Sequence, residues 1–252
     1  MGFPFMVSRR GALMNIKFLD YHKKVLSQFG QDGVIEKIFK LIKPINKYFV
    51  EFGSCGGDDG QGNTAHMRSY GFDGLLMDGR VVPYGVENTK KYPVKIEFVK
   101  VENVVDLFIK YEVPKDLDFL SIDIDGNDYW VLKEILTCYK PRVICVEANY
   151  NIPLKKNIVQ RYNPDFIWEG GGRFGASYRA LYGLGVKNEY SLVAICGCDM
   201  IFVMNEIIPE DLIIENINDV EKLVSIIIPD KDLIAALKDM FCWSEWIDLD
   251  KK

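Results

Sequence analysis

Short apolar segments that alternate with helical patterns constrain the fold of this chain more than any other feature. The apolar segments cover 48–52, 74–78, 95–101, 118–124 and 142–148. Apolar side chains recur at helical spacing before and between these segments, over 31–42, 63–70, 104–111 and 129–139. Strands that are apolar on both faces and separated by helices form parallel sheets that are covered on both sides. We therefore expect an α/β fold with a doubly wound, mostly parallel sheet.

Two further apolar segments, 191–195 and 200–204, follow a helical pattern near 176–183. Only the four residues 196–199 separate them, which is enough for a hairpin and too few for a crossover helix. The last strand must therefore run antiparallel to its neighbour. The prediction is a seven-stranded sheet that is parallel except for one C-terminal antiparallel strand.

One domain is enough to account for this pattern. A chain of 252 residues is long enough for one large α/β core, which we assign to 15–205. Residues 1–14 are expected to be a leader or a disordered extension, because Met14 begins a more ordinary opening. Residues 206–252 are acidic and show helical spacing. They indicate a helical appendage that packs on the sheet or forms the seam of a homodimer.

Charge and cysteine usage bear on the partners and the compartment. The formal charge is −5 and no run of four basic residues occurs, so neither nucleic acid nor a membrane surface is an expected partner. No segment reaches the ~18 consecutive apolar residues of a membrane span. The six cysteines include no C-x-x-C pair, and several lie inside apolar segments. This usage is typical of the reducing cytoplasm, where we place the protein.

A glycine-rich turn, GSCGGDDGQGNT (53–64), follows the first strand at the position where α/β sheets bind nucleotides. Its glycines do not satisfy the dinucleotide fingerprint, which needs glycine at i, i+2 and i+5. An acid, Glu51, precedes Gly53 and Gly57, and a carboxylate suits a cationic amino-acid group better than a pyrophosphate. Asp78, at the end of the second strand, is placed to accept both hydroxyls of a ribose. The pattern suggests S-adenosylmethionine (SAM) as cofactor; the alternative is a glycine turn with two solvated acids.

Acidic side chains are densest at the end of the fourth strand. Asp123 and Asp125 alternate there, and Glu147 and Asn149 alternate on the fifth strand. Because the carboxyl ends of parallel strands meet at one edge of a sheet, we predict Asp123, Asp125 and Glu147 to be catalytic. Either Mg²⁺ or a similar divalent cation is held by Asp123, Glu147 and Asn149, or a carboxylate acts directly as the base. The alternative role for acids at this position is capping of the next helix, which we expect of Asp128.

Six motifs, in this order, cover most of 25–205: SQFGQDG (27–33), VEFGSCGG (50–57) with NT (63–64), GLLMDG (74–79), DFLSIDIDGNDYWVL (118–132), RVICVEAN (142–149) and FGASYRALYGLG (174–185). The set resembles the FkbM-like branch of the class I SAM-dependent methyltransferases. That resemblance implies a Rossmann-like fold, SAM as the cofactor and a role in tailoring capsules, lipopolysaccharides or secondary metabolites. A weaker likeness is to methyltransferases encoded with the O-methyl phosphoramidate decoration of bacterial capsules.

The resemblance also implies that the segment around Gln28 covers the cofactor. We place further cofactor contacts at Asn63, Thr64 and Glu102. The glycine turn is longer than in relatives, so the roles of its individual glycines stay open.

Specificity for the acceptor is expected to lie in 150–177, which is too long for a plain connection. Trp168 and the glycine run 170–172 precede Arg173, which we expect to clamp a phosphorylated or sugar-linked acceptor. Weaker candidates are Lys155, Lys156 and Arg161 for the acceptor, and His66 for the base.

The expected function is transfer of a methyl group from SAM to a hydroxyl or phosphate-linked group of a small sugar- or nucleotide-linked metabolite, in the modification of capsular or surface polysaccharide. Two alternatives come from other classes of protein. One is a non-catalytic partner subunit that binds SAM or a glycan. The other is an NAD-dependent oxidoreductase, which the missing glycine register disfavours.

Overall fold

A computed structural model describes residues 18–53, 62–79, 93–214, 216 and 246–251. The segment 1–14, the glycines of 54–61 with Gly57 among them, and most of 206–252 lie outside this described part. The predictions made for them therefore stay predictions. None of the helices in the described ranges is long and apolar enough to cross a membrane.

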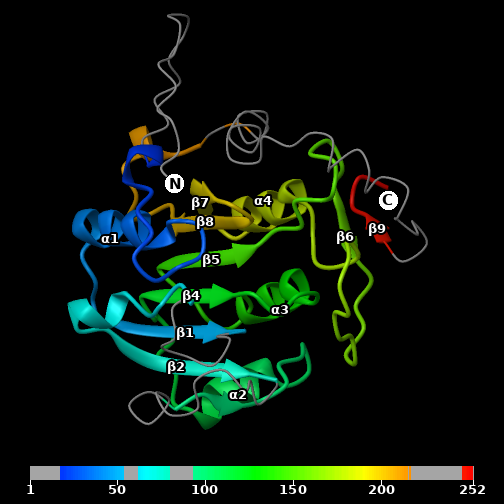
Figure 1. Ribbon diagram of the computed structural model, residues 1–252, viewed down its shortest axis with the longest axis horizontal. Coiled ribbons are helices and arrows are strands. Elements are labelled where there is room, and N and C mark those ends of the chain that lie inside the picture. Colours follow the sequence, from blue (N-terminus) through cyan, green and yellow to red (C-terminus); the bar gives the residue numbers. More distant parts are fainter. Residues whose placement is uncertain (1–17, 54–61, 80–92, 215, 217–245, 252) are drawn as a thin grey trace, which may run out of the picture.

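The central feature is a seven-stranded sheet with the order β3-β2-β1-β4-β5-β8-β7 (Figure 1). Its strands are β1 (Tyr48–Phe52), β2 (Asp73–Asp78), β3 (Lys95–Ile96), β4 (Phe119–Ile122), β5 (Val143–Glu147), β7 (Tyr190–Cys196) and β8 (Asp199–Met204). The strands from β3 to β5 pair in parallel, while β8 is antiparallel to both β5 and β7. The expected α/β sheet with one antiparallel strand is confirmed. The antiparallel strand lies inside the sheet, between β5 and the edge strand β7.

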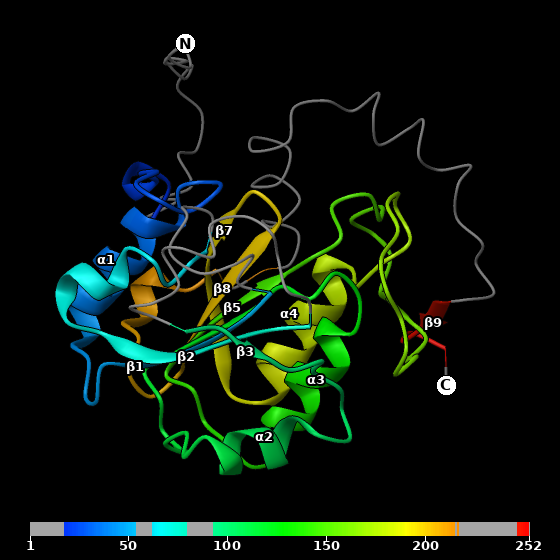
Figure 2. The ribbon, with the colours of Figure 1, turned by 60° about the horizontal axis from the view of Figure 1, so that its bottom comes forward.

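Helices cover both faces of this sheet (Figure 2). The helix α1 (Gln31–Ile42) packs on one face together with the short 3-10 helix η2 (Met67–Tyr70). The helices α2 (Val104–Lys110), α3 (Asp128–Ile135) and α4 (Tyr178–Lys187) pack on the other. Two hydrophobic cores result, one on each face, because side chains of successive strand residues point to opposite sides.

Smaller elements complete the described part. The 3-10 helix η1 (Leu19–Tyr21) precedes α1 and η4 (Glu210–Leu212) follows β8, while β6 (Ile158–Gln160) pairs antiparallel with β9 (Trp246–Asp248). The segment expected to be a helix over 63–70 forms only the single turn η2. Gly71, in the left-handed region at φ 79°, ends that turn and turns the chain toward β2.

Candidate functional site

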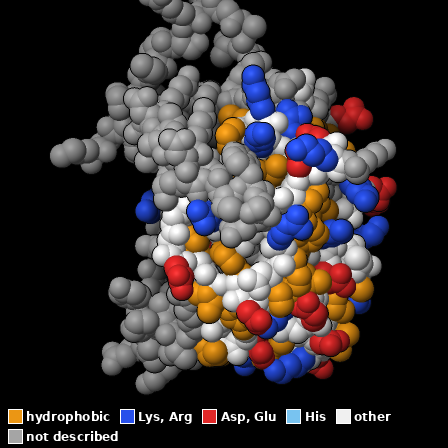
Figure 3. Space-filling view, turned by 90° about the vertical axis from the view of Figure 1, so that its right-hand side faces the viewer, with side chains coloured by type: hydrophobic (Ala, Val, Ile, Leu, Met, Phe, Trp, Pro, Cys, Tyr) orange, Lys and Arg blue, Asp and Glu red, His pale blue; other side chains and the backbone are white. Residues whose placement is uncertain are grey.

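A cavity of about 900 Å³ opens at the carboxyl ends of β1, β2, β3, β4 and β5. Its size is within the range of small-molecule and cofactor sites. The end of the molecule toward which the parallel strands point carries both acidic and basic side chains around hydrophobic ones (Figure 3). The lining residues come from the strand ends, from Gln28 and from the segment after β6; they are Gln28, Phe52, Gly53, Met77, Asp78, Gly79, Glu97, Phe98, Val99, Asp123, Ile124, Asp125, Asn127, Glu147, Phe166, Ile167, Trp168, Glu169 and Gly170.

Gly53 brings the ends of β1 and β4 close together. It adopts φ 69°, a conformation that L side chains rarely adopt, and its amide donates to the carbonyl oxygen of Met77. A Cβ atom at this position would lie 1.5 Å from the carbonyl oxygen of Asp123. Only glycine therefore permits this approach, which shapes the floor of the cavity beside Asp123.

Three acids lie in one row across neighbouring strands. Ile122 of β4 pairs with Val146 of β5, so the residues that follow them, Asp123 and Glu147, are neighbours at the edge of the sheet. Glu147 pairs in turn with Asp199 of β8. The parallel register and the inserted antiparallel strand thus gather carboxyl groups from three separate parts of the chain.

Burial and mutual repulsion make these acids hard to ionise. Burial raises the pKa of Asp123 well above its usual range, the negative charges of Asp199, Asp128 and Asp125 raise it further, and a hydrogen bond with Glu147 opposes the rise. Burial, followed by the charge of Asp123, likewise raises the pKa of Glu147. Carboxyl groups that share a buried site in this way retain protons that isolated groups would lose. Perturbed acids in a cavity are the pattern expected of a functional site.

Sequence reasoning missed Asp199, the third member of the row. Its side chain is 4 % exposed, and its Oδ2 accepts hydrogen bonds from Gln31 Nε2 at 2.5 Å and Asn63 Nδ2 at 3.3 Å. Burial raises its pKa, and the hydrogen bonds from Gln31, Asn63 and Cys145 oppose that rise. The only sequence signal was an acid in the short hairpin 196–199, and without the order β5-β8 it had no apparent relation to Glu147.

The loop between β4 and α3 presents Asp125. This residue has φ 57°, in the left-handed region that Asp tolerates better than most residues. Asp128 accepts hydrogen bonds from the backbone amides of Ile124 and Gly126, both at 2.8 Å, and so closes the loop from the helix side. The prediction that Asp128 is the N-cap is wrong, since Asn127 holds that position and Asp128 is the first residue of α3. Burial raises the pKa of Asp128 to about 6.

A divalent cation would find its ligands in Asp123, Asp125 and Glu147. One ligand atom from each lies within 4.8 Å of the others. Asn149 was also predicted to belong to this set, and its amide is used inside the protein. The Asn149 Nδ2 donates to the carbonyl oxygens of Gly172 and Phe174, and its Oδ1 accepts from the amide of Asn151.

Glu51, Asn63 and Thr64 were predicted to contact the cofactor, and none of them lines the cavity. Glu51 is 4 % exposed and accepts hydrogen bonds from the Asn63 amide at 2.6 Å and from the Thr64 hydroxyl. Alternation along β1 explains this position. Phe52 points toward the core formed by α2, α3 and α4, and Glu51 points toward the opposite face.

The other predicted cofactor residues divide into two groups. Gln28, Gly53, Asp78 and Asp123 line the cavity. Glu102 is exposed, accepts a hydrogen bond from the Tyr162 hydroxyl and lies outside the lining.

The acid that does line the cavity on the β3 side is Glu97, which sequence reasoning missed. Its carboxylate accepts hydrogen bonds from Lys110 Nζ at 2.6 Å and from the Tyr111 hydroxyl at 2.5 Å. Glu97 directly follows the two-residue strand β3, whereas the sequence pattern indicated a strand over 95–101. An acid inside an expected strand gave no signal of a strand end.

Of the residues predicted to bind the acceptor, some line the cavity and others do not. Trp168 lines the cavity, together with Phe166, Ile167 and Glu169 from the same segment. Its ring nitrogen donates to the carbonyl oxygen of Gly171 at 3.0 Å, and its ring contacts Phe174. Arg173 is exposed and does not line the cavity, and neither do the weaker candidates Lys155, Lys156 and Arg161.

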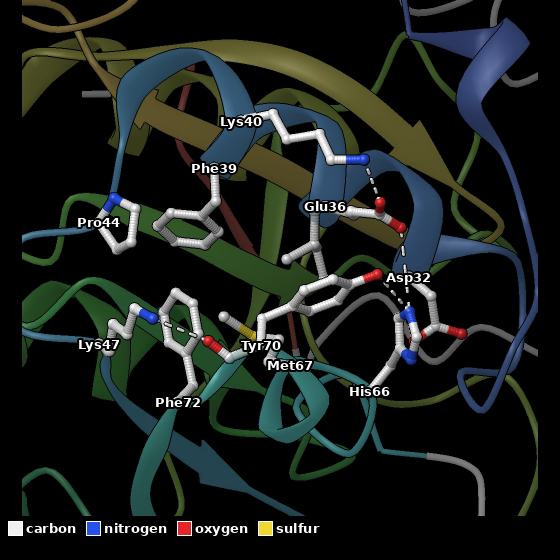
Figure 4. Close-up of a pocket in the computed structure, with 11 residues that line it drawn as sticks. Asp32, Glu36, Phe39, Lys40, Pro44, Lys47, His66, Met67, Tyr70 and Phe72 are labelled. Carbon is white, nitrogen blue, oxygen red and sulfur yellow. Dashed lines mark hydrogen bonds and ion pairs between the residues drawn. The ribbon is translucent and has the colours of Figure 1, made fainter.

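His66 lies in a different pocket, of about 260 Å³, between α1 and η2 (Figure 4). Its Nε2 is 3.0 Å from the Tyr70 hydroxyl and 3.9 Å from Glu36 Oε2. The walls of this pocket are mainly apolar and include Phe39 and Phe72. The structure thus separates His66 from the acids of the large cavity, in agreement with its low rank as a candidate base.

No protein-family model matches the sequence, and no curated protein matches it. Among solved structures, one similar chain is described as a hemolysin from Streptococcus thermophilus, with 12 % identity, a TM-score of 0.44, and coverage of 77 % of this chain and 71 % of that one. Another is the CMeT domain of the citrinin polyketide synthase, with 14 % identity, a TM-score of 0.39, and coverage of 69 % of this chain and 51 % of the other. The α/β fold itself is shown by the strand order and pairing described above.

Proposed function

We propose that this protein is a SAM-dependent methyltransferase that acts on a small molecule. The observation that carries the proposal is one cavity at the carboxyl edge of the parallel sheet, lined by Gly53, Asp78 and Asp123 at or just after the ends of β1, β2 and β4. Ligands of open α/β sheets bind at this edge, outside the carboxyl ends of the strands. The sequence predicted a cofactor contact at each of these three residues.

The lining residues fit the chemical groups of SAM. Asp78 ends β2 with a carboxylate that can accept hydrogen bonds from both ribose hydroxyls. Phe98 offers an aromatic face to the adenine, and a Cβ atom on Gly79 would lie 2.8 Å from its ring, so glycine leaves room there. The acidic lining complements the positive charges of SAM. When bound, SAM supplies a methyl group on a sulfonium, which is a good leaving group.

In this proposal, Asp123 or Glu147 accepts the proton that the acceptor atom loses. Methyl transfer from a sulfonium needs little covalent help, so alignment of the two reactants contributes most of the rate. The acceptor atom must lose a proton, and a carboxylate within hydrogen-bond reach receives it. A divalent cation, if it takes part, would be held by Asp123, Asp125 and Glu147 and would lower the pKa of an acceptor hydroxyl.

The proposal keeps the acceptor class that the sequence indicates, a small sugar- or nucleotide-linked metabolite used in surface-polysaccharide modification in the cytoplasm. A phosphate clamp by Arg173 is not part of it, because Arg173 does not line the cavity. A homodimer formed through 206–252 stays a prediction, since most of that segment lies outside the described residues.

Calorimetry with S-adenosylhomocysteine (SAH) tests the cofactor. We expect binding at micromolar concentration, and Asp78→Ala should weaken it by about 1–3 kcal/mol through the loss of charge-assisted hydrogen bonds. The matched control is Asp73→Ala, which removes an exposed acid from the opposite end of the same strand and should leave the affinity unchanged. No binding of SAH, or equal effects of the two variants, would refute the proposed cofactor site. Protection against heat by NAD without protection by SAH would point to the oxidoreductase instead.

Turnover measured with and without a chelator separates the two forms of the proton step. Asp123→Asn keeps the volume and removes the charge, and we expect turnover to fall by ~10²-fold or more. If a cation takes part, the chelator abolishes turnover while SAH still binds. Direct base catalysis predicts the same loss in Asp123→Asn and no effect of the chelator. A protein that binds SAH and methylates none of a broad set of metabolites would be a non-catalytic partner subunit.

A further inference from the structure

The charged side chains among the described residues that line the large cavity are all acidic. Six of its lining residues are acids, and none of the described lining residues is a lysine or arginine; the acids are Asp78, Glu97, Asp123, Asp125, Glu147 and Glu169. Glu97 is neutralised from outside the cavity by Lys110, whose Nζ is 2.6 Å away. Asp78 lies on the cofactor side. Four acids remain on the side of β4, β5 and the segment after β6, where the acceptor must approach.

Three of these acids converge on one point. Ligand oxygens of Asp123, Asp125 and Glu147 all lie within 4.8 Å of one another. A tetrahedral nitrogen with three charge-assisted hydrogen bonds of about 2.8 Å needs acceptors about 4.6 Å apart, so one ammonium group fits this cluster. The spacing alone would also allow a cation, and further features of the site favour the ammonium.

One oxygen of the cluster lacks a hydrogen-bond donor. Glu147 Oε2 is buried and has no hydrogen-bond partner within the described residues. A buried acceptor without a donor is costly, and native structures normally supply the donor from protein, water or ligand. Glu147 itself lines the cavity, so a ligand bound on the acceptor side would lie next to its carboxylate.

Aromatic side chains line the same cavity, and a Cβ atom on Gly126, the neighbour of Asp125, would lie 2.4 Å from the Phe166 ring. Phe166 and Trp168 line it beside Glu169, and the hydrogen bond of Trp168 to Gly171 with the ring contact to Phe174 holds the indole in place. Aromatic rings next to carboxylates are a common arrangement for binding ammonium groups through cation–π attraction. The same rings would pack against the apolar faces of a sugar-sized ligand.

From these features we propose that the acceptor is a primary amine, bound as an ammonium by Asp123, Asp125 and Glu147 and flanked by Trp168. The inference rests on the proposed methyltransferase function and names its substrate class. Asp123 takes one proton from the ammonium, and the freed nitrogen lone pair forms a bond to the methyl carbon. The carbon–sulfur bond breaks, and its electron pair stays on sulfur as the neutral thioether of SAH. The product is a secondary ammonium, and the proton passes from Asp123 to water.

A matched set of sugars tests the substrate class by binding. Glucosamine, glucose and glucose phosphate share one ring and differ in charge, and each is titrated by calorimetry or ligand-observed NMR into the protein saturated with SAH. We expect glucosamine to bind at least about tenfold more tightly than glucose, which corresponds to one charge-assisted contact. Glucose phosphate should bind more weakly than glucose. Chelator should leave all three affinities unchanged.

Two conservative variants give the control. Asp125→Asn keeps the shape, and asparagine tolerates the positive φ of this position, so the fold is retained. The variant should remove most of the preference for glucosamine over glucose, whereas Asp116→Asn, at an exposed acid outside the cavity, should not.

Equal binding of glucose and glucosamine, or a preference that survives in Asp125→Asn, would overturn the proposal. Tighter binding of glucose or glucose phosphate that appears only with added Mg²⁺ would overturn it in favour of a cation site. Failure of SAH to bind refutes the methyltransferase function separately, because the sugar preference can also be measured without SAH.

Discussion

Replacing Gly53 by alanine should damage the junction of β1 and β4 more than backbone strain alone can explain. The residue has φ 69°, and a left-handed conformation costs a non-glycine residue about 1–2 kcal/mol. A Cβ atom would also lie 1.5 Å from the carbonyl oxygen of Asp123, so one of the two strand ends must move. Overpacking of this kind costs about 1–3 kcal/mol. Gly53→Ala should therefore lower the free energy of unfolding by about 2–5 kcal/mol.

Gly175 provides a control with the same backbone strain and no clash. It has φ 63°, and a Cβ atom there would meet nothing within 4 Å. Gly175→Ala should therefore lose only the conformational part, about 1–2 kcal/mol. Urea unfolding followed by circular dichroism measures both variants against the parent protein. If the two variants lose the same stability, the contact between Gly53 and Asp123 contributes nothing, and the reasoning about the floor of the cavity fails.

Two further predictions concern buried charge. Asp118→Ala should lower the free energy of unfolding in urea by about 3–5 kcal/mol, because it leaves Arg142 buried without the carboxylate at 2.6 Å. The control Asp116→Ala, at an exposed acid, should change it by no more than about 0.5 kcal/mol. Similar losses in the two variants would contradict this prediction. The pKa of Asp128 is raised from 3.8 to about 6, so the folded state binds its proton more tightly than the unfolded state, and this contribution to stability is lost as the pH rises from about 4 to about 6. Urea midpoints measured across this window should fall with rising pH, and less so in Asp128→Asn; an equal or larger fall in that variant would show that Asp128 is not responsible.

The sheet and the acids at its edge were predictable because their signals are local. Short apolar segments and the four-residue gap at 196–199 fix the strand types, and the pairing confirmed them. Asp78 and Asp123 lie at or just after the ends of β2 and β4, so the rule for parallel sheets was enough to bring them to one cavity. The functional roles of these residues stay predictions.

Contacts between distant parts of the chain explain two of the positions that the sequence did not indicate. Asn149 was expected to face the cavity, but the carbonyl groups of Gly172 and Phe174, more than twenty residues later, take up its amide. Asp199 reaches Glu147 only because β8 inserts next to β5, an order that no local pattern specifies. The side of the sheet on which Glu51 lies could have been predicted from the sequence. Alternation along β1 places it opposite Phe52, and attention to its position in the strand would have placed it on the α1 side.

Residues that follow β8 cover the edge strand β7, so a chain shortened before them would expose this strand. All seven residues of this outermost strand are buried, and the segment 207–214 lies against it. The amide of Ile214 donates to the carbonyl oxygen of Leu192 at 2.9 Å, and Ile208 is 6 % exposed. A chain cut at Asn205 would uncover a long apolar strand with unpaired backbone groups. Such an edge is a template for pairing with another copy. A shortened chain of this kind would therefore tend to aggregate, even where its sheet and cavity were intact.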